Sequence, residues 1–236
     1  MRKLLTIGLM AVATITVSAQ NIQLHYDFGR NIYSDEEADR QKVTITLEHF
    51  NVDQWGSWYY FVDVDLSRKE TKGAYTEISR EFNLGKQSPF AAHIEYNGGL
   101  GSRSGSYQQA ALLGAAYNGH NTDFSATWSV QLLYKRFFKE SENNSAYNSA
   151  QLTGVWGINF ANKKCRFSGF VDFWRGENPS NGHGQLVILS EPQFWFNATE
   201  HFAVGTEVEI SNNFIYNAYN DKSFFVNPTL GVKWNF

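Results

Sequence analysis

Cysteine, proline and charged residues are all scarce in this chain of 236 residues. Cys165 is the single cysteine, so neither an intramolecular disulfide nor a cysteine-rich metal site can form. Only 4 residues are proline and 18% are charged, a composition that fits neither a disordered chain nor a charge-rich coiled coil. No apolar run of about 18 residues follows the N-terminal segment, which argues against membrane-spanning helices. One domain, stabilised by packing and backbone pairing, remains.

The first residues have the pattern of a secretory signal peptide. Arg2 and Lys3 form a positive start, an apolar stretch follows, and Val17-Ser18-Ala19 supplies a small-residue cleavage site. We therefore expect residues 1–19 to be a signal peptide and residues 20–236 to form the mature domain. A short membrane anchor is the alternative, but no stop-transfer charges follow the apolar stretch. Because that stretch is not followed by cysteine, a lipoprotein is not expected.

Cleavage would make the mature chain more acidic. It leaves 18 Lys and Arg residues against 23 Asp and Glu residues, a net charge of −5. A basic surface is what nucleic-acid binding requires, so we expect no nucleic-acid partner.

The main positive signal is alternation of apolar and polar residues with a period of two. In residues 21–28, Ile22, Leu24, Tyr26 and Phe28 share one face, and polar side chains occupy the other. The same pattern predicts about twelve strands in all. Their expected ranges are 21–28, 42–48, 58–67, 74–83, 89–97, 107–118, 124–136, 149–160, 164–174, 185–196, 202–212 and 224–236.

The expected connections alternate in length, which is typical of barrels in outer membranes. The odd connections, such as 30–41, 68–73 and 98–106, are longer than the even ones. Short periplasmic turns, longer extracellular loops and periplasmic termini require an even number of strands. The sequence therefore predicts an all-β fold, a transmembrane antiparallel up-and-down β-barrel of about 12 strands. We expect it in the outer membrane of a diderm bacterium.

The polarity of the two faces favours a membrane barrel over a soluble one. A lipocalin-like barrel hides its apolar face around one ligand and is shorter than this chain. Here the polar face carries charged residues in strand after strand, too many to bury in a dry core, whereas a wet lumen accommodates them. The other face is aliphatic in mid-strand and aromatic toward the ends, as lipid-facing bands are.

Three residues are unusual for their expected positions. Arg80 falls on the lipid-facing side of its strand, where a cation is costly at mid-membrane. It lies near the periplasmic end, where the cost falls to about 0 to 1 kcal/mol. Pro192 and Pro228 lie within strands of a barrel that has no edges, so we expect a β-bulge at one or both.

Several segments resemble the nucleoside-specific channel-forming outer-membrane proteins of the Tsx type, including Bacteroidetes members. These segments are WYYFVD at 58–63, GAYTEI at 73–78, FVDFW at 170–174, EPQFWFN at 191–197 and KWNF at 233–236. The resemblance implies a monomeric twelve-stranded barrel with a narrow, ligand-selective pore. It transfers no individual ligand contact, so the candidate pore residues come from face assignment alone.

The first candidate pore region lies on two neighbouring strands. Tyr59, Phe61 and Asp63 share the lumen face of one strand, and Tyr75, Glu77 and Glu81 share that of the next. Aromatics in a wet lumen have a use if they stack on a planar ligand, which contributes about 1 to 3 kcal/mol per base. Carboxylates accept hydrogen bonds from hydroxyl and amino groups. The alternative is that these rings plug the barrel against Trp174 and Trp195.

A second acidic and aromatic region is expected on the ninth, tenth and eleventh strands. Its candidate pore residues are Arg166, Asp172, Trp174, Glu191, Trp195 and Glu207. Arg166 is the expected countercharge of Asp172, and this pair can equally be a structural ion pair.

Metal binding and catalysis have little support in the sequence. His25 with Asp27 and His93 with Glu95 share faces, but two ligands are too few for a metal site. An outer-membrane lipid hydrolase would need Ser and His near the outer leaflet. However, His49 is expected at the periplasmic end, His183 lies in a loop, and no Gly-x-Ser-x-Gly occurs. We expect neither metal, cofactor nor enzymatic activity.

The expected function is therefore an outer-membrane channel for passive uptake of small solutes, most of all nucleosides. A structural or general-diffusion barrel is the alternative, and a lipid hydrolase comes after it. The expected partners are the solute, membrane lipid and, through Phe236, the barrel assembly machinery, with the protein as a monomer.

Overall fold

The computed structural model describes residues 17–67, 71–86, 88–101, 105–139, 145–178, 181–215 and 222–236. Within these residues, no helix has the length and apolar character needed to cross a membrane. The elements are β1 (Val17–Asp27), α1 (Gly29–Ile32), β2 (Val43–Asp53), β3 (Gly56–Leu66), β4 (Thr71–Asn83), β5 (Phe90–Gly101), β6 (Gly105–His120), β7 (Ala126–Phe137), β8 (Tyr147–Phe160), β9 (Cys165–Glu177), β10 (Gly184–Ser190), β11 (Gln193–Asn197), β12 (Phe202–Asn212) and β13 (Phe224–Asn235).

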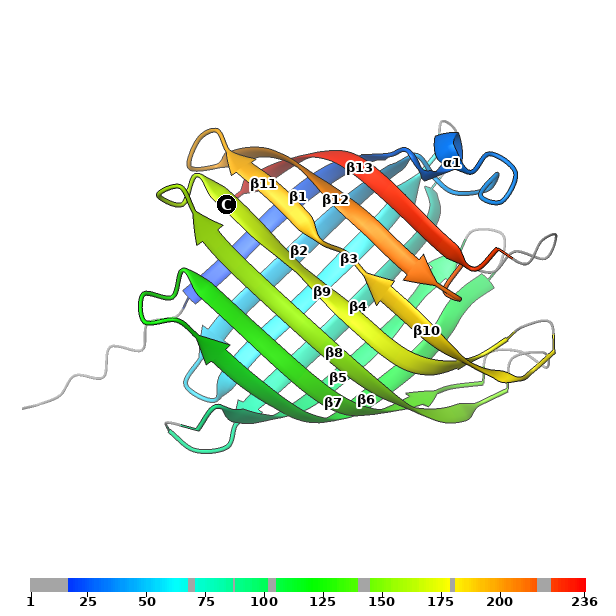
Figure 1. Cartoon of the computed structure of the whole chain (residues 1–236). Coiled ribbons are helices and arrows are strands. Elements are labelled where there is room, and N and C mark those ends of the chain that lie inside the picture. Colours follow the sequence, from blue (N-terminus) through cyan, green and yellow to red (C-terminus); the bar gives the residue numbers. More distant parts are fainter. Residues whose placement is uncertain are drawn as a thin grey trace, which may run out of the picture.

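The strands form one closed antiparallel sheet. Apart from β10 and β11, each strand pairs with the next along the chain, and β1 pairs with β13 from Asn21↔Asn235 to Asp27↔Thr229, which closes the barrel. Figure 1 shows the resulting cylinder of tilted strands. β10 and β11 both lie between β9 and β12, so they are two parts of one spanning strand. The barrel thus has twelve spanning strands, as predicted.

The predicted β-bulges at the two prolines are absent. The β10–β11 strand is interrupted at Glu191 and Pro192, but its register with β9 and β12 is the same on both sides of the break. On β9, Gly169 faces this break with φ +154, and a Cβ there would lie 2.5 Å from the carbonyl oxygen of Glu191. A glycine therefore accommodates the interruption without a register shift.

Pro228 is tolerated for a different reason. Its carbonyl oxygen accepts the N–H of Phe28 at 3.0 Å, so its missing donor also points toward the β1 side. Because β1 ends at Asp27, the proline costs no bond inside the β1–β13 ladder. Register shifts occur instead at Asp65/Leu66 and at Asn97/Gly99.

The strands around two expected loops are longer than the sequence predicts. Residues 98–106 were expected as a connection because glycine and serine dominate them, yet β5 continues to Gly101 and β6 starts at Gly105. Likewise β4 begins at Thr71. Cross-strand pairing overrides the low strand propensity of glycine here, helped by the register shift at Asn97/Gly99.

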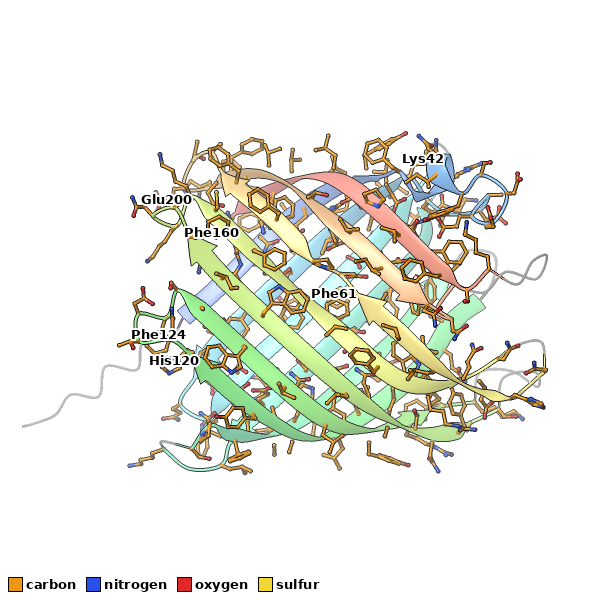
Figure 2. All side chains as sticks on the ribbon, viewed as in Figure 1. Lys42, Phe61, His120, Phe124, Phe160 and Glu200 are labelled. Carbon is orange, nitrogen blue, oxygen red and sulfur yellow. The ribbon has the colours of Figure 1, made fainter. Side chains whose placement is uncertain are left out.

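The two faces of the barrel separate as the alternation predicts. On β13, Phe225 and Asn227 point inward and are fully buried, whereas Leu230 and Trp234 point outward and are 57% and 47% exposed. The outer face presents many such apolar side chains (Figure 2). A closed barrel with an apolar exterior and a polar interior is an outer-membrane barrel, which confirms the predicted location.

The two ends of the barrel differ. The C-terminus lies at the end where β2–β3, β4–β5, β6–β7, β8–β9 and β11–β12 connect through turns, and α1 lies at the other end (Figure 1). Figure 2 places His120, Phe124 and Glu200 at the first end, Lys42 at the second, and Phe61 about midway. We take the end with the turns and the terminus as periplasmic.

Arg80 occupies the outer face near the periplasmic end, as predicted, but with a partner that the sequence did not indicate. It pairs across the strands with lipid-facing Trp58. Its guanidinium lies 4.9 Å and 5.0 Å from the ring centroids of Trp58 and Phe82, and Nη2 lies 2.8 Å from Asp53 Oδ1. The side chain is thus shielded from lipid by rings and neutralised by one carboxylate.

The predicted signal peptide lies mostly outside the described residues, which start at 17. In the full chain β1 begins at Val17, so cleavage after Ala19 would shorten it by the residues 17–19 and leave Gln20 first. The carbonyl of Gln20 accepts the N–H of Phe236 at 3.0 Å. Cleavage at this position stays a prediction.

Candidate functional site: the barrel lumen

Four aromatic side chains form a continuous series on the lumen wall, which we call the aromatic track: Tyr59 and Phe61 on β3, Tyr75 on β4 and Tyr107 on β6. The ring centroids are 6.1 Å apart from Tyr59 to Phe61, 6.1 Å from Phe61 to Tyr75, and 5.8 Å from Tyr75 to Tyr107. Three of these residues were predicted from the alternation, and Tyr107 was not. Phe61 of this track lies about midway along the barrel (Figure 2), and Tyr107 lies near the start of β6.

The predicted alternative has these rings plugging the barrel by packing against Trp174 and Trp195. Among the described residues, the ring contacts of the track are with one another. Trp174 packs edge-on against Phe214 at 6.0 Å, and Trp195 packs edge-on against His25 at 5.7 Å.

Carboxylates lie directly beside the aromatic track. Asp63 faces Tyr75 across β3 and β4, and Glu77 faces Phe61. The hydroxyl of Tyr75 donates to Glu77 Oε1 at 2.8 Å, and the hydroxyl of Thr46 donates to Asp63 Oδ1 at 2.5 Å. Each carboxylate keeps acceptor positions beyond the single bond it receives here. The predicted combination of rings and acceptors on neighbouring strands is therefore formed.

Glu81 belongs to a separate cluster nearer the periplasmic end. His93 bridges two carboxylates, with Nδ1 3.3 Å from Glu81 Oε1 and Nε2 3.0 Å from Glu95 Oε2. Asn118 donates to Glu81 Oε2 at 2.7 Å, and Gln131 donates to Glu81 Oε1 at 3.4 Å. The carboxylate of Glu81 is thus held by neighbouring side chains, away from the aromatic track with which the sequence grouped it.

Asp172 and Trp174 lie on the opposite part of the wall, where the structure adds Lys135. The Nζ of Lys135 donates to Gln151 Oε1 at 2.8 Å and lies 4.6 Å above the ring of Trp174. Asp172 accepts the hydroxyl of Thr153 at 2.5 Å. Trp174 also joins an apolar cluster inside the lumen, formed by Ala110, Leu112, Leu133, Phe137, Trp174 and Val187.

The expected Arg166–Asp172 ion pair is wrong. Arg166 donates to Asn159 at 3.3 Å near the periplasmic turn, and Asp172 lies six residues further along β9. With a rise of about 3.3 Å per residue, the two positions are about 20 Å apart. Sharing a face does not bring two residues together when the strand separates them.

The remaining candidates lie on or next to two neighbouring strands: Trp195 on β11, Glu207 on β12, and Glu191 just before β11. Trp195 is fully buried, donates to Gln193 Oε1 at 2.9 Å and lies 4.0 Å below the Nζ of Lys233. Gln193 in turn donates to Glu207 Oε2 at 2.5 Å. The break before β11 contains Glu191, and the alternation along this strand places its side chain on the lumen side.

Acidic groups dominate the lumen. Register and alternation place these strand carboxylates inside: Asp27, Glu48, Asp63, Asp65, Glu77, Glu81, Glu95, Asp172, Glu191, Glu207 and Glu209. Within the described strands, the lumen-facing Lys and Arg residues are Lys135, Arg166 and Lys233. A negative field in a low-dielectric channel attracts cations and disfavours anions.

The loop between β1 and β2 folds onto the inner wall at the extracellular mouth, which the sequence did not indicate. Arg40 Nη2 lies 2.9 Å from Asp27 Oδ2 and 3.0 Å from Glu209 Oε2. Tyr33 packs edge-on against Phe225 at 5.2 Å, and its hydroxyl accepts the N–H of Val226 at 3.2 Å. Glu209 shares the face of Glu207 by alternation, so this carboxylate could have been found from the sequence.

No metal site is formed by the histidines considered above. His25 contacts Gln23 at 2.9 Å and Thr229 at 3.0 Å rather than Asp27. In the part of the chain that the structure describes, no group of three or more His, Cys, Asp or Glu side chains is arranged to hold a metal ion.

The sequence also matches the model of one protein family along most of its length. That family is described as "Domain of unknown function (DUF5020)", and the match covers residues 19–236. The chain belongs to this family. No curated protein matches the sequence.

Solved structures with a similar fold include two porins. The NanC porin has a TM-score of 0.60 at 11% identity, with 92% of this chain and 100% of that chain covered. The KdgM porin has a TM-score of 0.52 at 13% identity, with 93% and 99% covered. The KdgM porin in complex with disordered oligogalacturonate has a TM-score of 0.51 at the same identity and coverage. At such low identities the likeness shows the barrel fold alone.

Proposed function

We propose that this barrel is a channel for passive uptake of small neutral or cationic solutes that carry a planar ring, nucleosides above all. The observation that supports this proposal most is the aromatic track from Tyr59 to Tyr107, which lies beside Asp63 and Glu77 in an acidic lumen. A base that stacks on one ring gains about 1 to 3 kcal/mol. Several weak sites in series let a solute pass from ring to ring, whereas one tight site would block the pore. The Tsx-type resemblance of the sequence points to the same solutes.

The acidic lumen leads us to propose solutes that differ in charge from the ligand of one structural neighbour. That KdgM structure holds an oligogalacturonate, which is an anionic oligosaccharide. The carboxylates around this lumen would repel such a ligand, and they would repel nucleotides for the same reason. We therefore expect selection for dephosphorylated, uncharged or cationic solutes.

Liposome swelling tests the proposal against its alternatives. Proteoliposomes should swell faster in adenosine or cytidine than in a sugar of equal mass, and slowest in adenosine monophosphate. Equal rates for all solutes would favour a general-diffusion pore, and no swelling would favour a structural barrel. Release of fatty acid from the same phospholipid vesicles would reveal the lipid hydrolase, which we do not expect.

A further inference from the structure

The loop between β1 and β2 contains a carboxyl group that is almost fully enclosed. The side chain of Glu37 is 1% exposed, although the loop lies at the extracellular mouth. Its Oε1 accepts a hydrogen bond from Asn227 Nδ2 at 2.8 Å, and Asn227 is itself fully buried on the inner face of β13. Glu37 thus attaches the loop to the barrel wall.

The second carboxyl oxygen of Glu37 and the amide oxygen of Asn227 have no hydrogen-bond partner. Both Glu37 Oε2 and Asn227 Oδ1 are buried without a donor. They also line the same small space beside Gly29, because a Cβ added to that glycine would lie 2.6 Å from Asn227 Oδ1 and 2.8 Å from Glu37 Oε2. Two buried acceptors in one small space repel, and each loses its hydration without compensation. A single proton shared between them removes both costs.

A carboxylic acid and a primary amide can form a ring of two hydrogen bonds. The amide N–H donates to one carboxyl oxygen, and the protonated second oxygen donates to the amide oxygen. The first of these bonds is present from Asn227 Nδ2 to Glu37 Oε1, and the two orphaned oxygens are the atoms that the second would join. The ring is complete only if Glu37 carries a proton.

We propose that Glu37 is a neutral carboxylic acid in the folded loop, that its proton closes a two-bond ring with Asn227, and that loss of this proton to solvent releases the loop from the extracellular mouth. We call this pair the carboxyl–amide latch. Any effect of the latch on solute flow rests on the proposed channel function, whereas the latch itself does not.

The charges around the latch are consistent with a neutral Glu37. Asp27 on β1 and Glu209 on β12 face it as carboxylates, and Asp65 on β3 lies further along the same wall. Arg40 on the loop is the counterion of this group of carboxylates. Its Nη2 lies 2.9 Å from Asp27 and 3.0 Å from Glu209, whereas its Nη1 lies 3.5 Å from Glu37. One guanidinium thus already serves two carboxylates. Burial raises the pKa of Glu37 above its ordinary value, against the opposing effect of Arg40.

The sign of the pH effect follows from this raised pKa. A carboxyl group that binds its proton more tightly in the latched loop stabilises that loop in acid. As the pH rises above the ordinary pKa of glutamate, this stabilisation is lost, and the loss is complete above the raised pKa. The loop should therefore be held most firmly in mildly acidic solution and loosen toward alkaline pH.

Infrared spectroscopy of the folded barrel detects the proton directly. The difference spectrum of wild type minus Glu37→Gln should contain the C=O band of a carboxylic acid at pH 6, and this band should disappear as the pH rises to 9. Glu36→Gln is the matched control, because Glu36 lies next in the chain and pairs with Lys222 at 3.2 Å. Its difference spectrum should show only a carboxylate band. A carboxylate band for Glu37 at pH 6 would overturn the proposal.

Cleavage of the loop by trypsin after Arg40 reports release without any transport. The rate in folded wild type, relative to a peptide of residues 28–42 at the same pH, should rise severalfold from pH 6 to pH 9, because the protonated latch that protects the loop at the lower pH is lost at the higher one. Glu37→Gln, whose amide can donate to Asn227 Oδ1 at any pH, should stay protected. Asn227→Asp should be cleaved fast at pH 7.

A wild-type rate that does not change with pH would overturn the latch even if Glu37→Gln failed to fold. Equal pH profiles for wild type and Glu37→Gln would do the same. A barrel that shows the pH-dependent cleavage but passes no solute would retain the latch and lose the proposed channel function.

Discussion

On the outer face of the barrel, Arg80 Nη2 lies 2.8 Å from Asp53 Oδ1 across the first periplasmic turn. Asp53 also accepts the backbone N–H groups of Trp55 at 2.8 Å and Gly56 at 3.0 Å. One carboxylate therefore shapes the turn and neutralises a cation that faces the membrane. This pairing explains why an arginine persists in the lipid-facing phase of a strand.

Removal of Asp53 should be more costly than removal of another turn carboxylate. Asp53→Ala leaves the buried guanidinium of Arg80 without its partner near lipid, so we expect a clearly larger loss of unfolding free energy than at a turn carboxylate that binds no cation. Asp123→Ala is the matched control, since Asp123 accepts from Ser125 in another periplasmic turn but binds no arginine. Urea unfolding in lipid vesicles measures both. Equal losses would show that the ion pair contributes nothing.

Phe61→Ala should weaken nucleoside binding in the pore. Loss of one stacking surface should raise the concentration of adenosine that half-blocks the current by about fivefold or more, while the salt conductance stays similar or rises. Tyr60→Ala is the control, because Tyr60 lies next on β3 but stacks on His49 at the outer face, 5.1 Å away. A similar effect of the Tyr60 change would contradict a role for the aromatic track.

Asp63→Asn combined with Glu77→Gln should reduce cation preference. Both carboxylates face the lumen beside the aromatic track, so their neutralisation weakens the negative field there. The reversal potential in a potassium chloride gradient should move toward zero. Glu200→Gln, in an exposed periplasmic turn, should leave it unchanged. An unaltered potential in the double variant would place the selectivity filter elsewhere in the lumen.

Deletion of Phe236 should impair assembly rather than transport. The residue is 71% exposed at the end of the closing strand, and its N–H is bonded to Gln20 at the seam between β1 and β13. We expect less heat-modifiable barrel in the membrane fraction, and Phe236→Tyr should restore it. Normal amounts of barrel with altered conductance would show that the terminal residue acts on the pore.

Period-two alternation predicted the lumen-facing side of the strands, because polar side chains recur on one face of most strands. It did not predict which lumen residues meet. Arg166 and Asp172 share a face yet lie far apart along β9, and Glu81 joins His93 instead of the aromatic track. Contacts of this kind depend on the register between strands, which a single sequence does not contain.

The inward loop was missed for a related reason. Arg40 and Glu37 lie in a segment without periodicity, and their partners Asp27, Glu209 and Asn227 come from three different strands. Proline was misread because its cost depends on where its missing donor points. At Pro228 the absent N–H would lie past the end of β1, so no bond of the β1–β13 ladder is lost. At Pro192 the interruption of the strand is accommodated by Gly169 on the neighbouring β9.

Single-channel current through the wild-type protein in a planar bilayer tests the central claim most directly. In a potassium chloride gradient, the account predicts cation preference, a reduction of current by adenosine on addition to either side, and a much weaker reduction by adenosine monophosphate. A current that adenosine leaves unchanged, or equal permeation of the nucleotide and the nucleoside, would contradict it.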